Sequence, residues 1–115
     1  MELKAFIEKL NVAPETVQFE DSMAVIEQNF EFTPTRFENG ETVNEANQNN
    51  GSCKIFAFAE LQGLSEQQAL ACFGHFYRED VLQHPDNTDH QNIRNFMKTG
   101  WGGVKFDSAA LAPKY

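Results

Sequence analysis

The chain has 115 residues, an ordinary length for one domain, and its 17 acidic residues outnumber its 9 basic residues to give a net charge of −8. No run of basic residues is present, so nucleic acids and anionic membranes, which bind through cationic patches, are disfavoured as partners. A protein partner with a basic or apolar surface fits this charge better.

The sequence also indicates a compartment. Its first residues lack the basic start and long apolar run of a signal peptide, and no apolar stretch reaches the length of a transmembrane helix. The chain has two cysteines. Without a secretory route, we expect both to be free thiols in a reducing compartment.

Apolar residues recur at helical spacing in the first thirty residues. The first predicted helix ends near Leu10 and rests on Leu3, Phe6, Ile7 and Leu10. The second ends near Asn29, has Asp21 or Ser22 as its N-terminal cap, and rests on Phe19, Met23, Ile26 and Phe30.

The pattern after the second helix predicts a β-hairpin. Asn39-Gly40 is the dipeptide that best suits a type I′ turn between two strands. This turn pairs Phe37 with Thr42, and it sets Glu38 against Glu41, a mild repulsion. Two strands alone are marginally stable, so we expect the hairpin to lie on the helices.

The apolar stretch from Ile55 to Leu61 predicts a third helix that ends at Gly63. Ser65 and Gln68 form the capping-box pattern of a fourth helix that starts almost at once. An apolar stripe predicts that the fourth helix is long and continues toward Pro85; its members are Leu70, Phe73, Tyr77 and Val81.

The last part of the chain predicts a helix from a cap at Asp89 to Gly100, and then a short strand over residues 104–106. Asp107 can cap one more helical turn. The fold class that we expect is α+β: a single domain over residues 1–115, mostly helical, with a small β-hairpin packed on the helices.

Cys53 is the candidate for catalysis, because an amide-rich loop runs into Gly51-Ser52-Cys53 just before the third helix. A cysteine in the first helical turn meets unpaired N–H groups that lower the pKa of its thiol. His75 or His90 would then supply the base. The alternative interpretation is that Cys53 is a small buried residue at a crowded helix start.

Two further groups are candidates for binding. Asn44, Asn49 and Asn50 can orient a polar ligand, or they can satisfy the backbone of their own loop. Trp101 is either an exposed anchor for a partner or a core residue carried on a glycine-rich turn.

Metal binding is the third possibility, since two imidazoles and two carboxylates lie close together at His84, Asp86, Asp89 and His90. Their order matches neither a calcium loop nor a helical zinc site, and a capped turn explains them. We predict no metal and no other cofactor.

Several stretches of the sequence resemble the HopJ type III effector family. They follow one another along almost the whole chain: Met23–Ile26, Phe32–Thr35, Val43–Ala46, Gln48–Lys54, Phe73–Gly74, Tyr77–Leu82 and Asp89–Met97. The family is named for a plant-pathogen effector, and similar proteins occur in many Gram-negative bacteria. The resemblance carries no catalytic residue over to this chain.

The resemblance implies a protein of the bacterial cytoplasm that is either exported by type III secretion or kept for a housekeeping role. Together with the lack of a complete catalytic set, it favours a domain that binds a protein partner without catalysis. The alternative is a thiol-dependent enzyme, such as a hydrolase, with Cys53 as its nucleophile.

Overall fold

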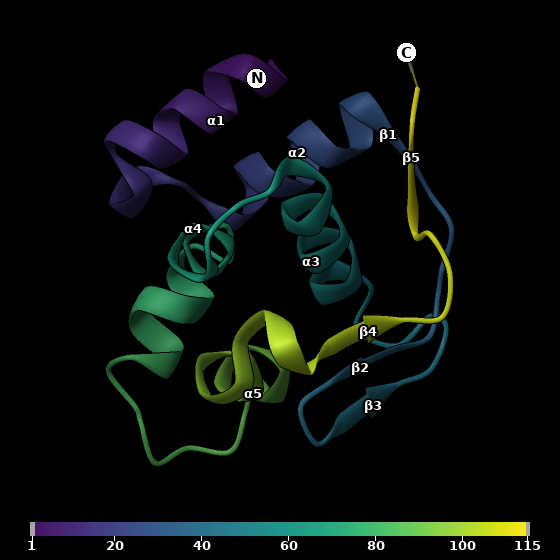
Figure 1. Cartoon of the computed structure of the whole chain (residues 1–115). Coiled ribbons are helices and arrows are strands. Elements are labelled where there is room, and N and C mark those ends of the chain that lie inside the picture. The colour runs from purple at the N-terminus through teal and green to yellow at the C-terminus, as the bar shows by residue number, and fades with distance from the viewer. Residues whose placement is uncertain (1, 115) are drawn as a thin grey trace.

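Helix α3, residues Asn50–Gln62, runs through the middle of the molecule (Figure 1). Its sequence is apolar on nearly all sides, which is typical of a buried helix. The buried side chains are Cys53, Ile55, Phe56, Ala57, Phe58 and Ala59. The structure is a computed structural model that describes residues 2–114.

The other helices lie around α3. They are α1 (Leu3–Val12), α2 (Phe19–Asn29), α4 (Glu66–Ala71) and α5 (Gln91–Thr99). Three shorter helical segments connect them: 3₁₀ turns at Pro14–Thr16 and Gly100–Gly103, and a π-helical segment at Phe76–Val81.

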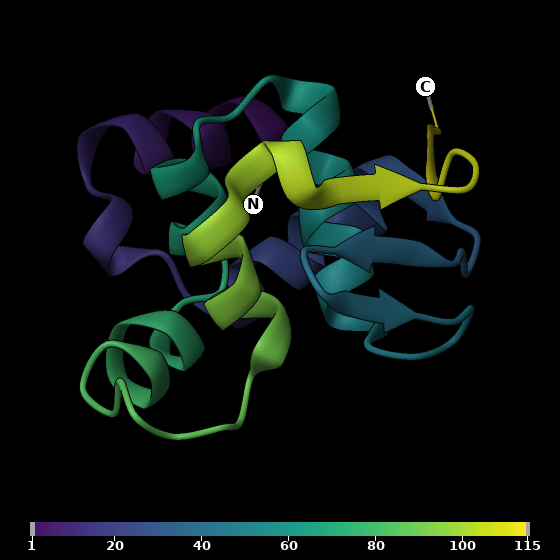
Figure 2. The same cartoon turned by 60° about the horizontal axis from the view of Figure 1, so that its bottom comes forward.

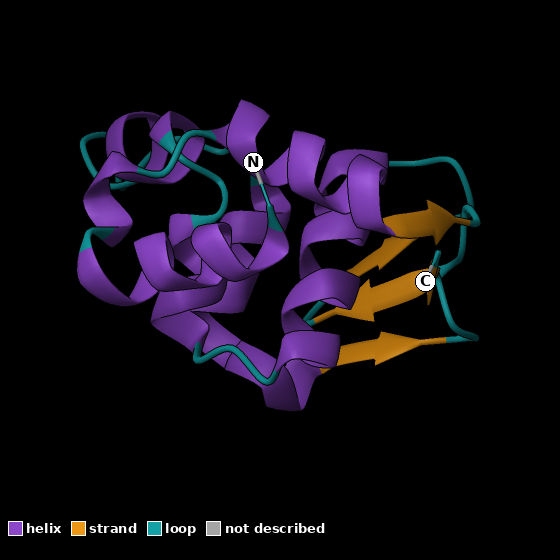
Figure 3. Ribbon diagram, turned by 90° about the horizontal axis from the view of Figure 1, so that it is seen from above, coloured by secondary structure: helices purple, strands orange, loops and turns teal. Residues whose placement is uncertain are grey.

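The strands gather at one side of the helices (Figure 3). They are β1 (Phe30–Phe32), β2 (Phe37–Asn39), β3 (Thr42–Asn44), β4 (Val104–Phe106) and β5 (Leu111–Pro113). One antiparallel sheet has the order β3-β2-β4, shown beside the helices in Figure 2, and the other pairs β1 with β5. The α+β class is confirmed, with more strands than the predicted hairpin.

The predicted hairpin exists, but its predicted register is wrong. Phe37 pairs with Asn44 and Asn39 pairs with Thr42, so the two-residue loop is Gly40-Glu41. Gly40 has a φ of +59° at the first loop position, which a type II′ turn requires. The register differs from the prediction because of Asn39. Its buried side chain donates a hydrogen bond to α5, which holds Asn39 within the strand.

The predicted length of the fourth helix is also wrong. The capping box of Ser65 and Gln68 starts α4 as predicted, but the helix ends at Ala71. Gly74 then takes a φ of +60°, and a Cβ at this position would lie 2.5 Å from the backbone nitrogen of Phe19. The close approach of two backbones breaks the helix, and the chain continues as the π-helical segment.

Two predicted caps, those of α2 and α5, are replaced by other residues. Helix α2 is capped at Gln18, whose N–H donates to Asp21 over 3.1 Å. Helix α5 has His90 at its N-cap position in place of the predicted Asp89, and Asn49 is the N-cap residue of α3. The ends of α2 and α3 fall where the sequence predicts, at Asn29 and before Gly63. Residues after Asp107 form β5 in place of a last helical turn.

We predict that Gly74→Ala lowers the free energy of unfolding by about 2–4 kcal/mol, because alanine is strained at positive φ and its methyl group would overlap the Phe19 backbone. Urea denaturation measures this change. Gly102→Ala is the control, since no atom lies within 4 Å of its Cβ position and its φ is not positive. Equal stability of the two variants would contradict the role assigned to Gly74.

Candidate functional site

A pocket of about 490 Å³ opens between the first turns of α3 and α5. We call it the α3–α5 pocket. It is lined by Phe19, Thr42, Asn49, Gly51, Ser52, Phe73, Phe76, His90, Gln91, Asn92 and Ile93. None of these lining residues is Asp, Glu, Lys or Arg, although the chain has 17 acidic and 9 basic residues.

The apolar part of the lining is mostly aromatic. The rings of Phe19 and Phe76 meet edge to face, with centroids 5.0 Å apart, and both side chains are half-buried. Phe73 and Ile93 are buried. Gly51 lies close to Phe19: a Cβ there would be 3.1 Å from the Phe19 ring, so the ring would have to shift to accept a larger residue. The pocket therefore offers partly exposed ring surface at its base.

The two helices that border the pocket begin in the same unusual way. Their N-cap residues, Asn49 and His90, are both left-handed, with φ of +53° and +51°. Neither side chain accepts a hydrogen bond from the helix that it starts. Both side chains are therefore available to other partners at the pocket rim.

A buried amide network fixes the position of this rim. Asn44 exchanges hydrogen bonds with Asn92 of α5, each over 3.0 Å, and accepts one from Asn49 over 2.7 Å. Asn39 donates to the Asn92 carbonyl over 2.7 Å. The side chain of Asn44 is therefore part of the fold, and the predicted binding role does not suit it. Asn50 is half-buried, and its Oδ1 has no partner among the described residues.

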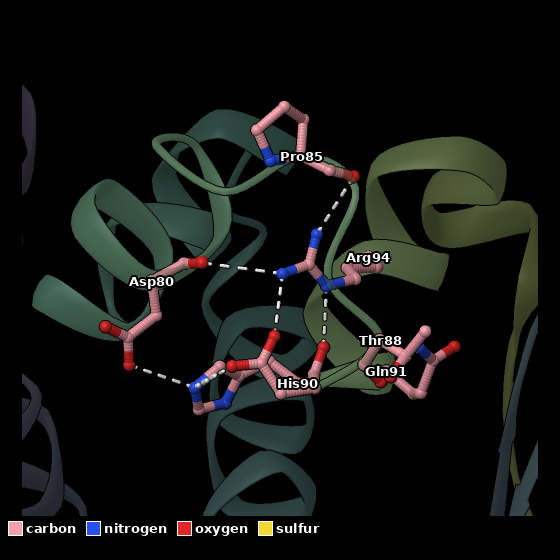
Figure 4. A network of polar contacts seen from close by, with 7 residues as sticks. Asp80, Pro85, Thr88, His90, Gln91 and Arg94 are labelled. Carbon is pink, nitrogen blue, oxygen red and sulfur yellow. Dashed lines mark hydrogen bonds and ion pairs between the residues drawn. The ribbon is translucent and has the colours of Figure 1, made fainter.

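His90 joins the pocket to an ionic network (Figure 4). Its Nε2 lies 3.0 Å from Oδ2 of Asp80 and 3.8 Å from Oδ2 of Asp89, and its ring lies 5.2 Å from that of Phe76. Asp80 comes from the π-helical segment, whereas Asp89 precedes α5. The imidazole is thus held between the carboxylates and the aromatic base of the pocket.

Arg94 ties this network to the chain (Figure 4). Its guanidinium donates to Oδ1 of Asp89 over 2.7 Å and to the carbonyls of Asp89, Pro85 and Asp80. The side chain of Arg94 is only 10% exposed. Its hydrogen bond to Asp89 lowers the pKa of that carboxyl group. Arg94 therefore closes the loop before α5 and neutralises Asp89.

Of the two interpretations of Cys53, the structure agrees with the buried residue at the helix start and not with the activated thiol. It is fully buried, its N–H donates to the Asn49 carbonyl over 3.0 Å, and its thiol contacts the Thr35 carbonyl at 3.7 Å. Burial raises the pKa of the Cys53 thiol, so the predicted lowering is wrong. The thiol is also not among the groups that line the pocket; the neighbouring Ser52 is.

The two proposed bases are placed differently. His90 lines the pocket, whereas the half-buried ring of His75 packs on Phe76 with centroids 4.2 Å apart. No hydrogen bond in the described part of the chain joins Cys53 to either histidine. The second thiol, Cys72, is buried as well, and burial raises its pKa to about 12.

Two alternatives were predicted for Trp101, an exposed anchor and a core residue, and the structure shows the core environment. Its ring meets Phe96 edge to face at 5.0 Å, and its Nε1 donates to the Leu64 carbonyl over 3.1 Å. The side chain is half-buried. With its polar atom already bonded within the chain, Trp101 lacks the donor that an anchor residue would offer a partner.

The four residues that were considered as possible metal ligands do not form one cluster. His84 and Asp86 are exposed, whereas Asp89 and His90 belong to the Arg94 network. Within residues 2–114 no group of three or more His, Cys, Asp or Glu side chains is placed to hold a metal ion. Over the same residues, no helix has both the length and the apolar character needed to cross a membrane.

A family model described as HopJ type III effector protein matches residues 3–111. The chain belongs to the HopJ family. The resemblance seen in the sequence is therefore confirmed over nearly the whole HopJ chain.

A solved structure is similar to this HopJ protein throughout. It is described as the crystal structure of a protein of unknown function, VPA0580. The two share 60% sequence identity, the match covers 99% of this chain and 95% of the other, and the TM-score is 0.98. No curated protein matches the chain.

Sequence reasoning identified Asn49 and His90 but missed most of the site. Ser52 was named only as the neighbour of Cys53, Phe19 and Phe73 only as core residues, and Phe76 not at all. Asp80 carried no signal, because its partner lies ten positions away across a loop of no regular structure. The spacing of residues on separate elements does not reveal that they share one pocket.

The burial of both thiols predicts low reactivity. At pH 8 we expect iodoacetamide to leave Cys53 and Cys72 of the folded protein unmodified, because the raised pKa of each keeps it protonated and water does not reach it. Mass spectrometry counts the modified thiols, and the urea-unfolded chain should take two labels. Rapid labelling of native Cys53, assigned with Cys53→Ser, would contradict this environment.

The lowered pKa of Asp89 predicts a dependence of stability on pH. The unfolded carboxyl titrates near its ordinary value of about 3.9, so the Asp89–Arg94 interaction stabilises the fold above that pH and loses its effect as pH falls through the lower folded value. Asp89→Asn should therefore be less stable than the natural chain at pH 7, with the difference shrinking below about pH 4.

Thermal unfolding between pH 3 and 7 measures this difference. Asp86→Asn is the matched control, because the Asp86 side chain makes no hydrogen bond or ion pair within residues 2–114. The control should follow the natural chain at every pH. If the stability difference between Asp89→Asn and the natural chain were the same at every pH, the charge of the Asp89 carboxylate would contribute nothing to stability.

Proposed function

We propose that this HopJ protein acts by binding a partner protein, without catalysis of its own, and that the α3–α5 pocket receives a side chain of the partner. The observation that carries the proposal is the pocket itself: its lining combines partly exposed aromatic rings with polar side chains and contains no Asp, Glu, Lys or Arg. Recognition sites commonly combine an apolar body with a few placed polar groups.

The absence of an assembled nucleophile supports binding over chemistry. Cys53 is buried with a raised pKa, and Nε2 of His90 faces Asp80. Within the described residues, His90 makes no hydrogen bond to a serine, threonine or cysteine. A thiol-dependent enzyme needs an accessible thiolate and a base within hydrogen-bond reach, so this alternative is not favoured.

The charge of the chain supports a basic or apolar partner surface. A net charge of −8 repels acidic proteins at long range and attracts basic ones. The family description names type III effectors, and we propose on that basis that the protein leaves the bacterial cytoplasm by type III secretion. Equal amounts in culture supernatants of a normal and a secretion-deficient strain would contradict export.

Blocking the pocket tests the binding function. Ser52 is half-buried on the pocket wall, so Ser52→Trp should fill the space with an indole ring. We expect tagged natural protein to capture a specific partner from extracts of host cells or of its own bacterium, and Ser52→Trp to lose at least about nine-tenths of it.

Ser108→Trp is the matched control, because Ser108 is exposed in the loop before β5 and does not line the pocket. Circular dichroism and thermal unfolding establish that both variants fold. The control should capture the partner as the natural chain does. Equal capture by Ser52→Trp would remove the pocket from the proposal.

A further inference from the structure

We infer that the partner presents an aromatic side chain next to a basic residue, with the aromatic ring in the α3–α5 pocket and the cation paired with Asp80. This inference rests on the proposed binding function and names the chemistry of the partner. It follows from two properties of neighbouring surfaces: an aromatic pocket with no Asp, Glu, Lys or Arg in its lining, and the partly exposed carboxylate of Asp80 beside it, which contacts His90.

The pocket suits an aromatic side chain. Phe19 and Phe76 are only half-buried and already meet edge to face, so an incoming ring can add contacts of the same kind. The pocket volume of about 490 Å³ is ample for one aromatic side chain. Large rigid rings are also the residues that contribute most to binding at protein interfaces.

The rim favours tryptophan or tyrosine over phenylalanine. The Nδ2 group of Asn49 donates to Asn44, whereas its Oδ1 accepts no hydrogen bond within residues 2–114. Asn49 is exposed on the pocket wall. Its oxygen can therefore accept from an indole N–H or a phenol O–H whose ring enters the pocket.

The charge beside the pocket selects a cation. The Asp80 side chain is 42% exposed and contacts the His90 imidazole that lines the pocket. No Lys or Arg side chain within residues 2–114 forms an ion pair with Asp80, whereas Asp89 on the other side of His90 is paired with Arg94. Asp80 thus has room for a partner cation, and an acidic partner would be repelled.

Arginine fits this position better than lysine. Its planar guanidinium can bond to a carboxylate through two N–H groups and can also stack on an aromatic or imidazole ring. A single imidazole bridges Asp80 to the pocket. The basic residue of the partner is therefore expected directly beside the aromatic residue in sequence.

Short synthetic peptides test this recognition directly. The probe is acetyl-Gly-Ser-Arg-Trp-Ser-Gly-amide, and the matched peptides carry Gln-Trp, Glu-Trp or Arg-Leu at the two central positions. Titrations of ¹⁵N-labelled full-length protein, followed by NMR chemical shifts, report both the affinity and the residues that respond.

We expect the Arg-Trp peptide to bind most tightly and to shift the amide signals of the pocket residues. Replacing Trp with Leu should weaken binding by about tenfold or more, because the aromatic contacts are lost. Replacing Arg with Gln should weaken it about threefold, as for a half-exposed ion pair, and Glu should weaken it further.

Asp80 variants separate charge from shape. Asp80→Asn should bind the Arg-Trp and Gln-Trp peptides equally, and Asp80→Lys should prefer the Glu-Trp peptide. Ser52→Trp should bind none of them, whereas Ser108→Trp should behave as the natural chain. Thermal unfolding of each variant confirms that the comparison concerns folded protein.

The outcomes distinguish the aromatic-basic inference from the proposed binding function of the pocket. Partner capture that depends on Ser52, together with peptides that bind equally or not at all, would overturn the aromatic-basic inference and leave the binding function standing. Partner capture that is indifferent to Ser52 would overturn the proposed function of the pocket. A preference for Arg-Trp that survives Asp80→Lys would overturn the assignment of Asp80.

Discussion

The fold depends on the burial of α3, and on Phe56 above all. The Phe56 ring lies 4.8–6.4 Å from the rings of its neighbours, which come from β2, the segment after α4, α5 and the turn after α5; they are Phe37, Phe73, Phe96 and Trp101. Two positions along α3, Phe58 packs against Phe6 and Phe30. Through two aromatic side chains, α3 thus contacts α1, α5 and a strand of each sheet.

This burial also sets the chemistry that the site can offer. The first turn of α3 lies at the surface, where Asn49 and Ser52 border the pocket, and the helix enters the core at Cys53. The change from surface to core falls between two adjacent residues. A thiol that looks like a nucleophile in the sequence is therefore a packing residue, and its polar neighbours are the groups that a ligand meets.

Much of the local structure could be predicted from the sequence. The helical spacing before Asn29, the capping box at Ser65 and the glycine at position 63 all concern residues close together in the chain. The hairpin register could not be predicted, because it depends on Asn39 bonding to Asn92 of a distant helix. The break at Gly74 likewise depends on the Phe19 backbone.

The candidate site was less predictable for the same reason. Its base joins Phe19 to Phe76, and its ionic edge joins Asp80 to His90 across a loop. Periodicity reports which face of an element is apolar, but it does not report which elements meet. The residues identified in advance were those whose own loop was unusual, such as Asn49.

The pairing of the strands has a consequence for the order in which the protein folds. The C-terminal segment supplies β4 to one sheet and β5 to the other, and both pair with strands from the first third of the chain. Such distant pairings incur a loop-closure cost before any contact is gained, so they form slowly. A nascent chain on the ribosome consequently keeps β1 and one edge of β2 unpaired until residues 104–113 have emerged, so neither sheet can close before that segment is made.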